Sequence, residues 1–266
     1  MIFTISQVRD YLWCEQYAHN IHTLRRGIER SSKALWLGDL FHQSMAARLL
    51  GKPLPFGYGD EFKDPEVTSG FRAMLPFLTT WEVPSDWKVL QVERPLEVPV
   101  GRHRLLCRPD ALIVDQAGTW LVQWKTLAKG ADLGLNQERV RLSFHECGYH
   151  YACSRLSTGH DAKRISGTIL GTYKKLTKAD LAAHADPFNI TRVARDWWTV
   201  VERVDALALV ADRMEESIER GKHLKNTDSC FGRFGNSLCQ FYQVCHEQGS
   251  LKDPPFVDLP DRYNDL

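Results

Sequence analysis

Residues 105–126 read LLCRPDALIVDQAGTWLVQWKT, and this stretch decides the fold class that the sequence predicts. Two segments rich in branched and aromatic residues, Leu105–Val114 and Thr119–Thr126, have the composition of β-strands. The short polar connection between them, Asp115–Gly118, suits a hairpin turn. We therefore expect an antiparallel hairpin inside a β-sheet.

The second of these strands has a polar face. Side chains two residues apart in a strand point to the same side, so Gln123 and Lys125 share one face while Trp124 faces the other. A hairpin that closes near Gly118 also brings Asp110 beside Gln123 and Lys125. Because a buried strand is more stable with apolar side chains, this polar cluster predicts a functional site.

The rest of the chain alternates between helical and strand-like patterns around this hairpin. The order predicts an α/β fold with a central mixed β-sheet flanked by helices, in a single domain over residues 1–266. Ser6 is the expected N-cap of the first helix, and residues 251–266 are expected to form an extended tail. We expect helices over 4–22, 34–50, 66–81, 136–157 and 191–221, and further strands over 87–96 and 164–173.

Composition places the chain among ordinary globular proteins, with 43% hydrophobic and 25% charged residues in 266. No apolar run approaches the roughly 20 residues that cross a membrane, and the start, MIFTISQVRDYLW, lacks a signal-peptide pattern. We expect an intracellular, cytoplasmic protein without a membrane partner. The net charge of +1 means that a nucleic-acid-binding face would have to be local. The candidate basic clusters are Arg25/Arg26/Arg30, Arg102/Arg104/Arg108, Arg139/Arg141 and Lys174/Lys175/Lys178.

The residue types on the hairpin suit hydrolysis of a phosphodiester. Carboxylate oxygens are the ligands that Mg²⁺ and Mn²⁺ prefer, and such an ion polarises a phosphoryl oxygen and activates a bound water. A lysine beside it can orient the nucleophile or neutralise developing charge. Each residue alone also fits a structural role: Asp110 near a turn, Lys125 as an extended strand lysine, His42 as an ordinary helix histidine.

Three motifs together resemble one nuclease superfamily. Asp110, twelve residues and then Gln123-Trp124-Lys125-Thr126 are similar to the D…(D/E)xK signature of the PD-(D/E)XK nucleases, and most similar to their RecB-like branch. Gly38-Asp39-Leu40-Phe41-His42 resembles the G-x-x-x-H helix of that branch. Tyr149, with His145 four residues before it, matches the spacing of its Q-x-x-x-Y motif but lacks the Gln.

This resemblance implies a restriction-endonuclease-like core, with His42, Asp110 and position 123 as Mg²⁺ or Mn²⁺ ligands. Lys125 would be the catalytic lysine, and Tyr149 would belong to the catalytic site. It also implies an exonuclease that acts on single-stranded DNA or duplex ends, in bacterial or phage repair, recombination or defence. The chain has no G-x-x-x-x-G-K-[ST] motif, so a helicase or recombination partner would supply any unwinding.

Gln123 departs from the family pattern, which has Asp or Glu at that position. The loss of one carboxylate should weaken metal binding and could abolish cleavage. Two explanations stay open: a natural Q-x-K variant, or a Glu→Gln change introduced to trap a substrate complex. Gln123→Glu should raise Mg²⁺- or Mn²⁺-dependent DNA degradation.

Seven cysteines, an odd number, favour metal binding or buried thiols over disulfides. Cys239 and Cys245 are spaced C-x₅-C, Cys230 precedes them, and Cys14 lies in the first helix; Cys107, Cys147 and Cys153 are expected in the core. A subset of RecB-like nucleases, including AddB and CRISPR-associated members, carries one N-terminal and three C-terminal cysteines.

The resemblance to that subset implies that Cys14, Cys230, Cys239 and Cys245 hold a [4Fe–4S] cluster, with residues 1–30 and 222–250 as a clasp that joins the two chain segments. Zinc is the alternative metal, since four cysteines suit it equally.

Two rival functions stay open. The first is a non-catalytic DNA-binding module that has a nuclease fold without the carboxylate at position 123. The second is a zinc-stapled scaffold protein with no nucleic-acid role.

Overall fold

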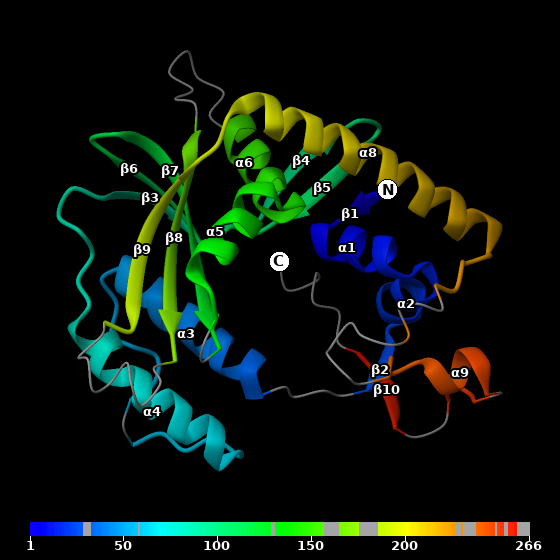
Figure 1. Cartoon of the computed structure of the whole chain (residues 1–266), viewed down its shortest axis with the longest axis horizontal. Helices are drawn as coiled ribbons and strands as arrows, with labels where there is room; N and C mark the ends of the chain where they lie inside the picture. The colour runs from blue at the N-terminus through cyan, green and yellow to red at the C-terminus, as the bar shows by residue number, and fades with distance from the viewer. Residues whose placement is uncertain are drawn as a thin grey trace. The chain divides into compact units, whose positions relative to one another are not determined.

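The computed structural model describes residues 1–28, 33–57, 59–128, 131–156, 165–175, 186–226, 230, 238–247, 249–252 and 255–259 (Figure 1). The chain divides into two compact units. The sheet unit comprises Ser31–Leu96 and Cys107–Arg203, and the cysteine unit comprises Met1–Arg30, Glu97–Leu106 and Val204–Leu266. That residues 1–266 act as one nuclease domain stays a prediction.

The sheet unit contains a five-stranded mixed sheet, which confirms the predicted fold class. The strand order is β3-β6-β7-β8-β9, in which β7 and β8 run parallel and the other neighbours run antiparallel. The expected hairpin is β6–β7, and its last pair is Asp115 with Gly118. The strands are β3 (Lys88–Val92), β6 (Ala111–Asp115), β7 (Gly118–Leu127), β8 (Ile165–Lys174) and β9 (Phe188–Ala194).

Helices lie on both sides of this sheet (Figure 1). On one side α3 (Lys33–Leu49) and α4 (Pro65–Thr80) bury a core around the fully buried Trp124. On the other, α5 (Leu133–Leu142) and α6 (Phe144–Leu156) form the crossover between the parallel strands β7 and β8. Gly171 on β8 makes room for the Trp124 ring, since a Cβ there would lie 2.2 Å from it.

The cysteine unit is built from short elements. Its sheet has the order β1-β5-β4, and β10 pairs with β2 in an antiparallel ribbon. Residues of α8 from Val204 onward belong to this unit. The elements are β1 (Ile2–Phe3), α1 (Ile5–Trp13), α2 (Glu15–Ala18), a π-helical turn (His19–Thr23), β2 (Arg26–Ile28), β4 (Leu96–Val100), β5 (His103–Cys107), α8 (Trp197–Arg220), α9 (Tyr242–His246) and β10 (Phe256–Asp258).

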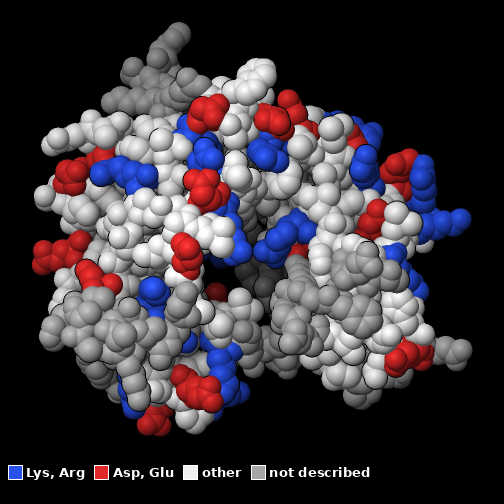
Figure 2. All heavy atoms as spheres, in the orientation of Figure 1, with Lys and Arg blue, Asp and Glu red and all other residues white. Residues whose placement is uncertain are grey.

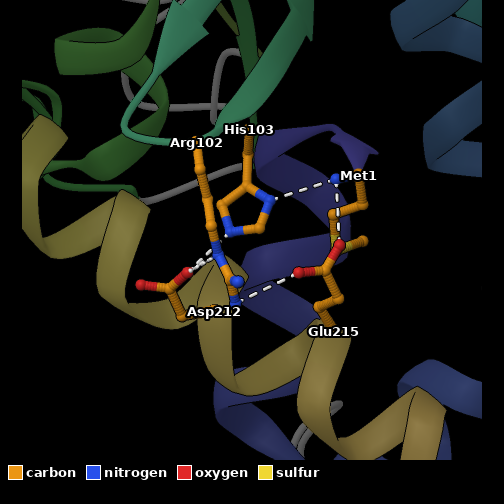
Figure 3. A network of polar contacts seen from close by, with 5 residues as sticks. All are labelled: Met1, Arg102, His103, Asp212 and Glu215. Carbon is orange, nitrogen blue, oxygen red and sulfur yellow. Dashed lines mark hydrogen bonds and ion pairs between the residues drawn. The ribbon is translucent and has the colours of Figure 1, made fainter.

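A polar network joins β1 and the β4–β5 hairpin to α8 (Figure 3). The amino group of Met1 lies 3.1 Å from both His103 Nδ1 and Glu215 Oε1. His103 Nε2 lies 2.9 Å from Asp212 Oδ1, and Arg102 bonds to both Asp212 and Glu215. His103 is buried and has little access to water, so the network provides its hydrogen-bond partners instead.

The predicted helix over 4–22 is wrong in its continuity. It is interrupted at Cys14, whose backbone is extended (φ −164°, ψ 117°), and the helix N-cap is Thr4 rather than Ser6. Thr4 forms a capping box with Gln7, which satisfies two backbone N–H groups at the helix start. Cys14 is the C-cap of α1: its N–H still donates to the Asp10 oxygen at 2.9 Å, while its extended backbone changes the direction of the chain before α2.

The predicted strand over 105–114 also divides in two. β5 ends at Cys107 and β6 begins at Ala111, because Pro109 has no N–H to donate to a ladder. The predicted strand over 87–96 ends likewise at Val92. It is followed by Glu93, whose backbone is left-handed (φ 49°).

Three more boundaries differ from the prediction. The helix expected over 136–157 is two helices separated at Ser143, which has an extended backbone. The helix expected from 191 begins at Trp197, because residues 188–194 form β9, an alternating segment that sequence reasoning assigned to the helix. The expected tail contains β10, while residues 260–266 lie outside the described residues. Within the described ranges, no helix is long and apolar enough to cross a membrane.

Candidate metal site and cysteine cluster

Asp110 lies where the chain enters β6. Ala111 pairs with Val122, so the hairpin register places Asp110 across from Gln123, as expected. The carboxylate is almost fully buried, and its Oδ2 accepts a hydrogen bond of 2.7 Å from the backbone N–H of Trp124. One oxygen is therefore fixed by the strand, while Oδ1 faces another partner.

That partner is His42 on α3. His42 Nδ1 lies 3.2 Å from Asp110 Oδ1. Four residues earlier on the same helix face, Gly38 approaches β7, and a Cβ there would lie 3.7 Å from Thr126 Oγ1. Burial alone would lower the pKa of His42, but the hydrogen bond and the charge of Asp110 raise it above its usual value.

Glu93 is a third member that the sequence analysis missed. One ligand atom each of His42, Glu93 and Asp110 lie within 4.8 Å of one another. The Glu93 N–H donates to the backbone oxygen of Asp110 at 2.9 Å, which fixes the chain beyond β3 against the start of β6. The signal available in the sequence was weak: a glutamate directly after a strand and two residues before Pro95.

The negative charge of Asp110 affects the protonation of the Glu93 carboxylate. Burial and the nearby charge of Asp110 raise the pKa of Glu93 to about 7, despite the opposing charges of Arg108 and His42. Arg108 Nε lies 3.3 Å from Glu93 Oε2, but its side chain is half exposed, so solvent screens this pair. Two nearby carboxylates beside one imidazole form a donor set that suits a hard divalent cation.

Gln123 and Lys125 lie on the same face of β7, as expected. Gln123 is 1% exposed, and its Oε1 accepts a hydrogen bond of 3.4 Å from Lys125 Nζ. Its Nε2 is buried without a hydrogen-bond partner among the described residues. A buried amide left partly unpaired is unfavourable for stability, which fits a position retained for function.

Tyr149 on α6 lies within electrostatic range of this site. Burial and then the charge of Asp110 hold its pKa well above the usual value, and Glu93 contributes in the same direction. The His145 ring lies 4.3 Å from the Tyr149 ring, centroid to centroid. The fold thus brings the residues expected from separate motifs to one region of the sheet unit.

The four cysteines of the predicted cluster all belong to the cysteine unit. Burial raises the pKa of the Cys245 thiol to about 11; Lys225 opposes this shift, while Cys239, Cys14 and Cys230 add to it. The Cys239 N–H donates to the Cys230 oxygen at 2.9 Å. The other three thiols therefore lie within electrostatic range of Cys245, although no three of the four sulfurs in the described chain lie within 4.8 Å of one another.

The other three cysteines, Cys107, Cys147 and Cys153, are buried, as expected. Burial raises the pKa of each of these thiols, to about 12 for Cys107. They are consequently protonated at neutral pH and belong to the packed interior of the sheet unit.

Many residues of the candidate basic clusters are occupied by intramolecular contacts. Arg26 bonds to Asp258 and to the backbone oxygens of Leu251 and Phe256. Arg102, Arg104, Arg108 and Arg141 pair with carboxylates, while Arg30 and Lys178 lie outside the described residues. Figure 2 shows positive and negative side chains interspersed over the visible face.

No family model and no curated protein matches this chain. A solved crystal structure has a similar fold: a protein from Eubacterium rectale described as a putative exonuclease. The TM-score is 0.52 at 13% sequence identity, and the match covers 94% of this chain and 89% of that one. At so low an identity the similarity shows the fold alone.

Proposed function

We propose that this chain is a divalent-metal-dependent deoxyribonuclease of the PD-(D/E)XK superfamily, similar to its RecB-like branch. The observation that carries the proposal is the meeting of His42, Glu93 and Asp110 donor atoms within 4.8 Å. Lys125 follows two residues after the strand position that lies across from Asp110. The similar fold of the protein from Eubacterium rectale, which is described as a putative exonuclease, supports this reading.

The donor set fits Mg²⁺ or Mn²⁺, because it combines carboxylate oxygens with one imidazole nitrogen. Such an ion polarises a phosphoryl oxygen and lowers the pKa of a bound water. Asp110 holds its orientation through the Trp124 N–H, and His42 is aligned by Asp110 Oδ1. Lys125 places a positive charge on the same strand face, where it would neutralise a scissile phosphate.

We propose DNA as the partner, in single strands or at duplex ends, and an exonuclease role in repair, recombination or phage defence. The chain would work inside the cell, beside a helicase or recombination protein where duplex DNA has to be opened. The competing function is a non-catalytic DNA-binding module, which the amide at position 123 favours.

Degradation of end-labelled single- and double-stranded DNA separates these functions. With Mn²⁺ or Mg²⁺ we expect nucleotide release that falls at least about 100-fold in Asp110→Asn and in Lys125→Ala, in line with the loss of a charge-stabilising group. Glu82→Gln, at an exposed site, is the control. Gln123→Glu should raise activity. If the wild-type and Gln123→Glu proteins both bind DNA but neither degrades it, the nuclease function would be overturned and the non-catalytic DNA-binding module would be supported.

For the cysteine unit we propose a structural [4Fe–4S] cluster held by Cys14, Cys230, Cys239 and Cys245. Four thiols of one unit from distant parts of the sequence support this assignment. Zinc also binds four thiolates, in tetrahedral geometry, so a metal analysis has to distinguish the two. Cys230 Sγ also lies 3.7 Å from His246 Nε2.

Metal analysis of anaerobically purified protein tests this part. We expect a brown protein with about four iron and four sulfide per chain, as a cubane requires. A colourless protein with one zinc and no sulfide would overturn the cluster and leave the zinc-stapled alternative.

A further inference from the structure

We infer that Glu93 supplies the anionic metal ligand that position 123 lacks, so that the chain with Gln123 retains a complete divalent-cation site. This inference rests on the proposed function and concerns the same site. Gln123 would then not leave the site incomplete, because the second carboxylate would come from Glu93 at the end of β3 rather than from β7.

The first argument is charge. Without Glu93, the candidate ligands offer one carboxylate, one imidazole and one neutral amide, so a single negative charge would face a divalent cation. Glu93 doubles that charge, and its carboxylate lies with His42 and Asp110 inside the 4.8 Å limit. Mg²⁺ and Mn²⁺ are hard cations whose binding depends on anionic oxygen ligands.

The second argument is the backbone. Glu93 has φ 49°, in the left-handed region that is unfavourable for a residue with a Cβ. Its N–H bonds to the Asp110 oxygen at 2.9 Å, and Pro95 restricts the chain that follows. The conformation is thus held by its surroundings, and it brings the Glu93 side chain to Asp110 and His42.

The third argument is the environment of Gln123. Its Oε1 is used by Lys125, and its Nε2 has no partner in the described chain. The neutral amide therefore brings no negative charge to the site, and the second carboxylate comes from Glu93.

Mn²⁺ binding to the full-length, anaerobically purified chain tests the inference without an activity readout. Free Mn²⁺ is measured by electron paramagnetic resonance for wild type, Glu93→Gln, Asp110→Asn and the exposed control Glu82→Gln. Gln is nearly isosteric with Glu and retains the backbone N–H, and equal melting temperatures would show that the variants fold. We expect Glu93→Gln to weaken Mn²⁺ binding at least about tenfold, since even partners of metal ligands contribute that much.

The double variant Glu93→Gln/Gln123→Glu is the rescue. It returns a carboxylate to β7 and should recover much of the lost affinity, while Glu82→Gln should bind as wild type does. Equal Mn²⁺ affinity of Glu93→Gln and wild type, with a loss in Asp110→Asn, would overturn the role of Glu93; the proposed function would then rest on the His42–Asp110 pair. Equal affinity in Asp110→Asn as well would overturn the metal site, and the proposed function with it.

Discussion

The sheet unit and the cysteine unit position their proposed metal ligands in different ways. In the sheet unit, strand register and a backbone hydrogen bond to Asp110 fix the donors within 4.8 Å of one another. In the cysteine unit, Cys245 lies on the five-residue helix α9, and Cys14 lies between α1 and the four-residue helix α2. We infer that the sheet positions its donors without a bound metal, whereas a cluster bound by the four cysteines should stabilise the cysteine unit.

The largest expected effect is the loss of one cluster cysteine. Cys245→Ser should lower iron content and destabilise the cysteine unit by about 3 kcal/mol or more, by analogy with the removal of a crosslink that closes a long loop. Hydrogen exchange read separately for the two units measures this. Cys153→Ser, in the interior of the sheet unit, is the control that should retain iron. Unchanged iron in Cys245→Ser would remove this cysteine from the ligand set.

The converse change disturbs the sheet unit without touching the thiols. Gly171→Ala would place a Cβ 2.2 Å from the Trp124 ring, so the strand or the ring has to move. We expect a loss of about 1–3 kcal/mol, the usual cost of overpacking a core. Urea unfolding measures it, and iron content should not change. Gly57→Ala, with open space at its Cβ, is the matched control.

Removal of divalent ions should affect activity but not the fold. Chelation by EDTA should abolish DNA degradation while the circular dichroism spectrum stays the same, because the donors are positioned by strands. Added Mn²⁺ should stabilise the protein by about 2.7 kcal/mol at 100 times its dissociation constant. If chelation unfolded the protein, the sheet unit would depend on the bound ion for its stability, which would contradict this account.

The smallest expected effect is a pH dependence of the cysteine unit. The His19 and His223 rings stack with centroids 3.8 Å apart, and burial lowers the pKa of both below 6.5. As the pH falls, these histidines are protonated in the unfolded chain at a higher pH than in the folded chain. The free energy of unfolding is therefore greatest above pH 6.5 and decreases as the pH drops below it. Glu15, through Ser217, and the His22–Asp10 pair are the other titratable groups nearby.

His223→Phe retains a stacked ring without the titrating nitrogens. Its melting temperature should fall less between pH 7.5 and 5.5 than that of wild type. An equal fall in both proteins would assign the acid sensitivity to other groups.

The fold was largely predictable because the branched and aromatic residues of β7 and the turn at Asp115–Gly118 are local signals. The interruptions were less predictable. Cys14 leaves its helix through an extended backbone that its own residue type does not require. Strand β9 was missed because it lies directly before α8 and the two periodic patterns merge.

For the candidate site, the order of motifs predicted the residues that the hairpin brings together. Asp110, Gln123 and Lys125 follow from strand register alone. Glu93 could not be found in this way, because its place depends on a left-handed backbone and on a contact with Asp110 between separate strands. Neither leaves a periodic trace in the sequence.

The most direct test of the metal site is anomalous diffraction from a crystal of the wild-type chain soaked in Mn²⁺. We predict a Mn²⁺ peak in the sheet unit, separate from any iron signal of the cysteine unit, bonded to His42, Glu93 and Asp110. A crystal in which those three residues bind no Mn²⁺, or in which the ion lies elsewhere, would contradict the account.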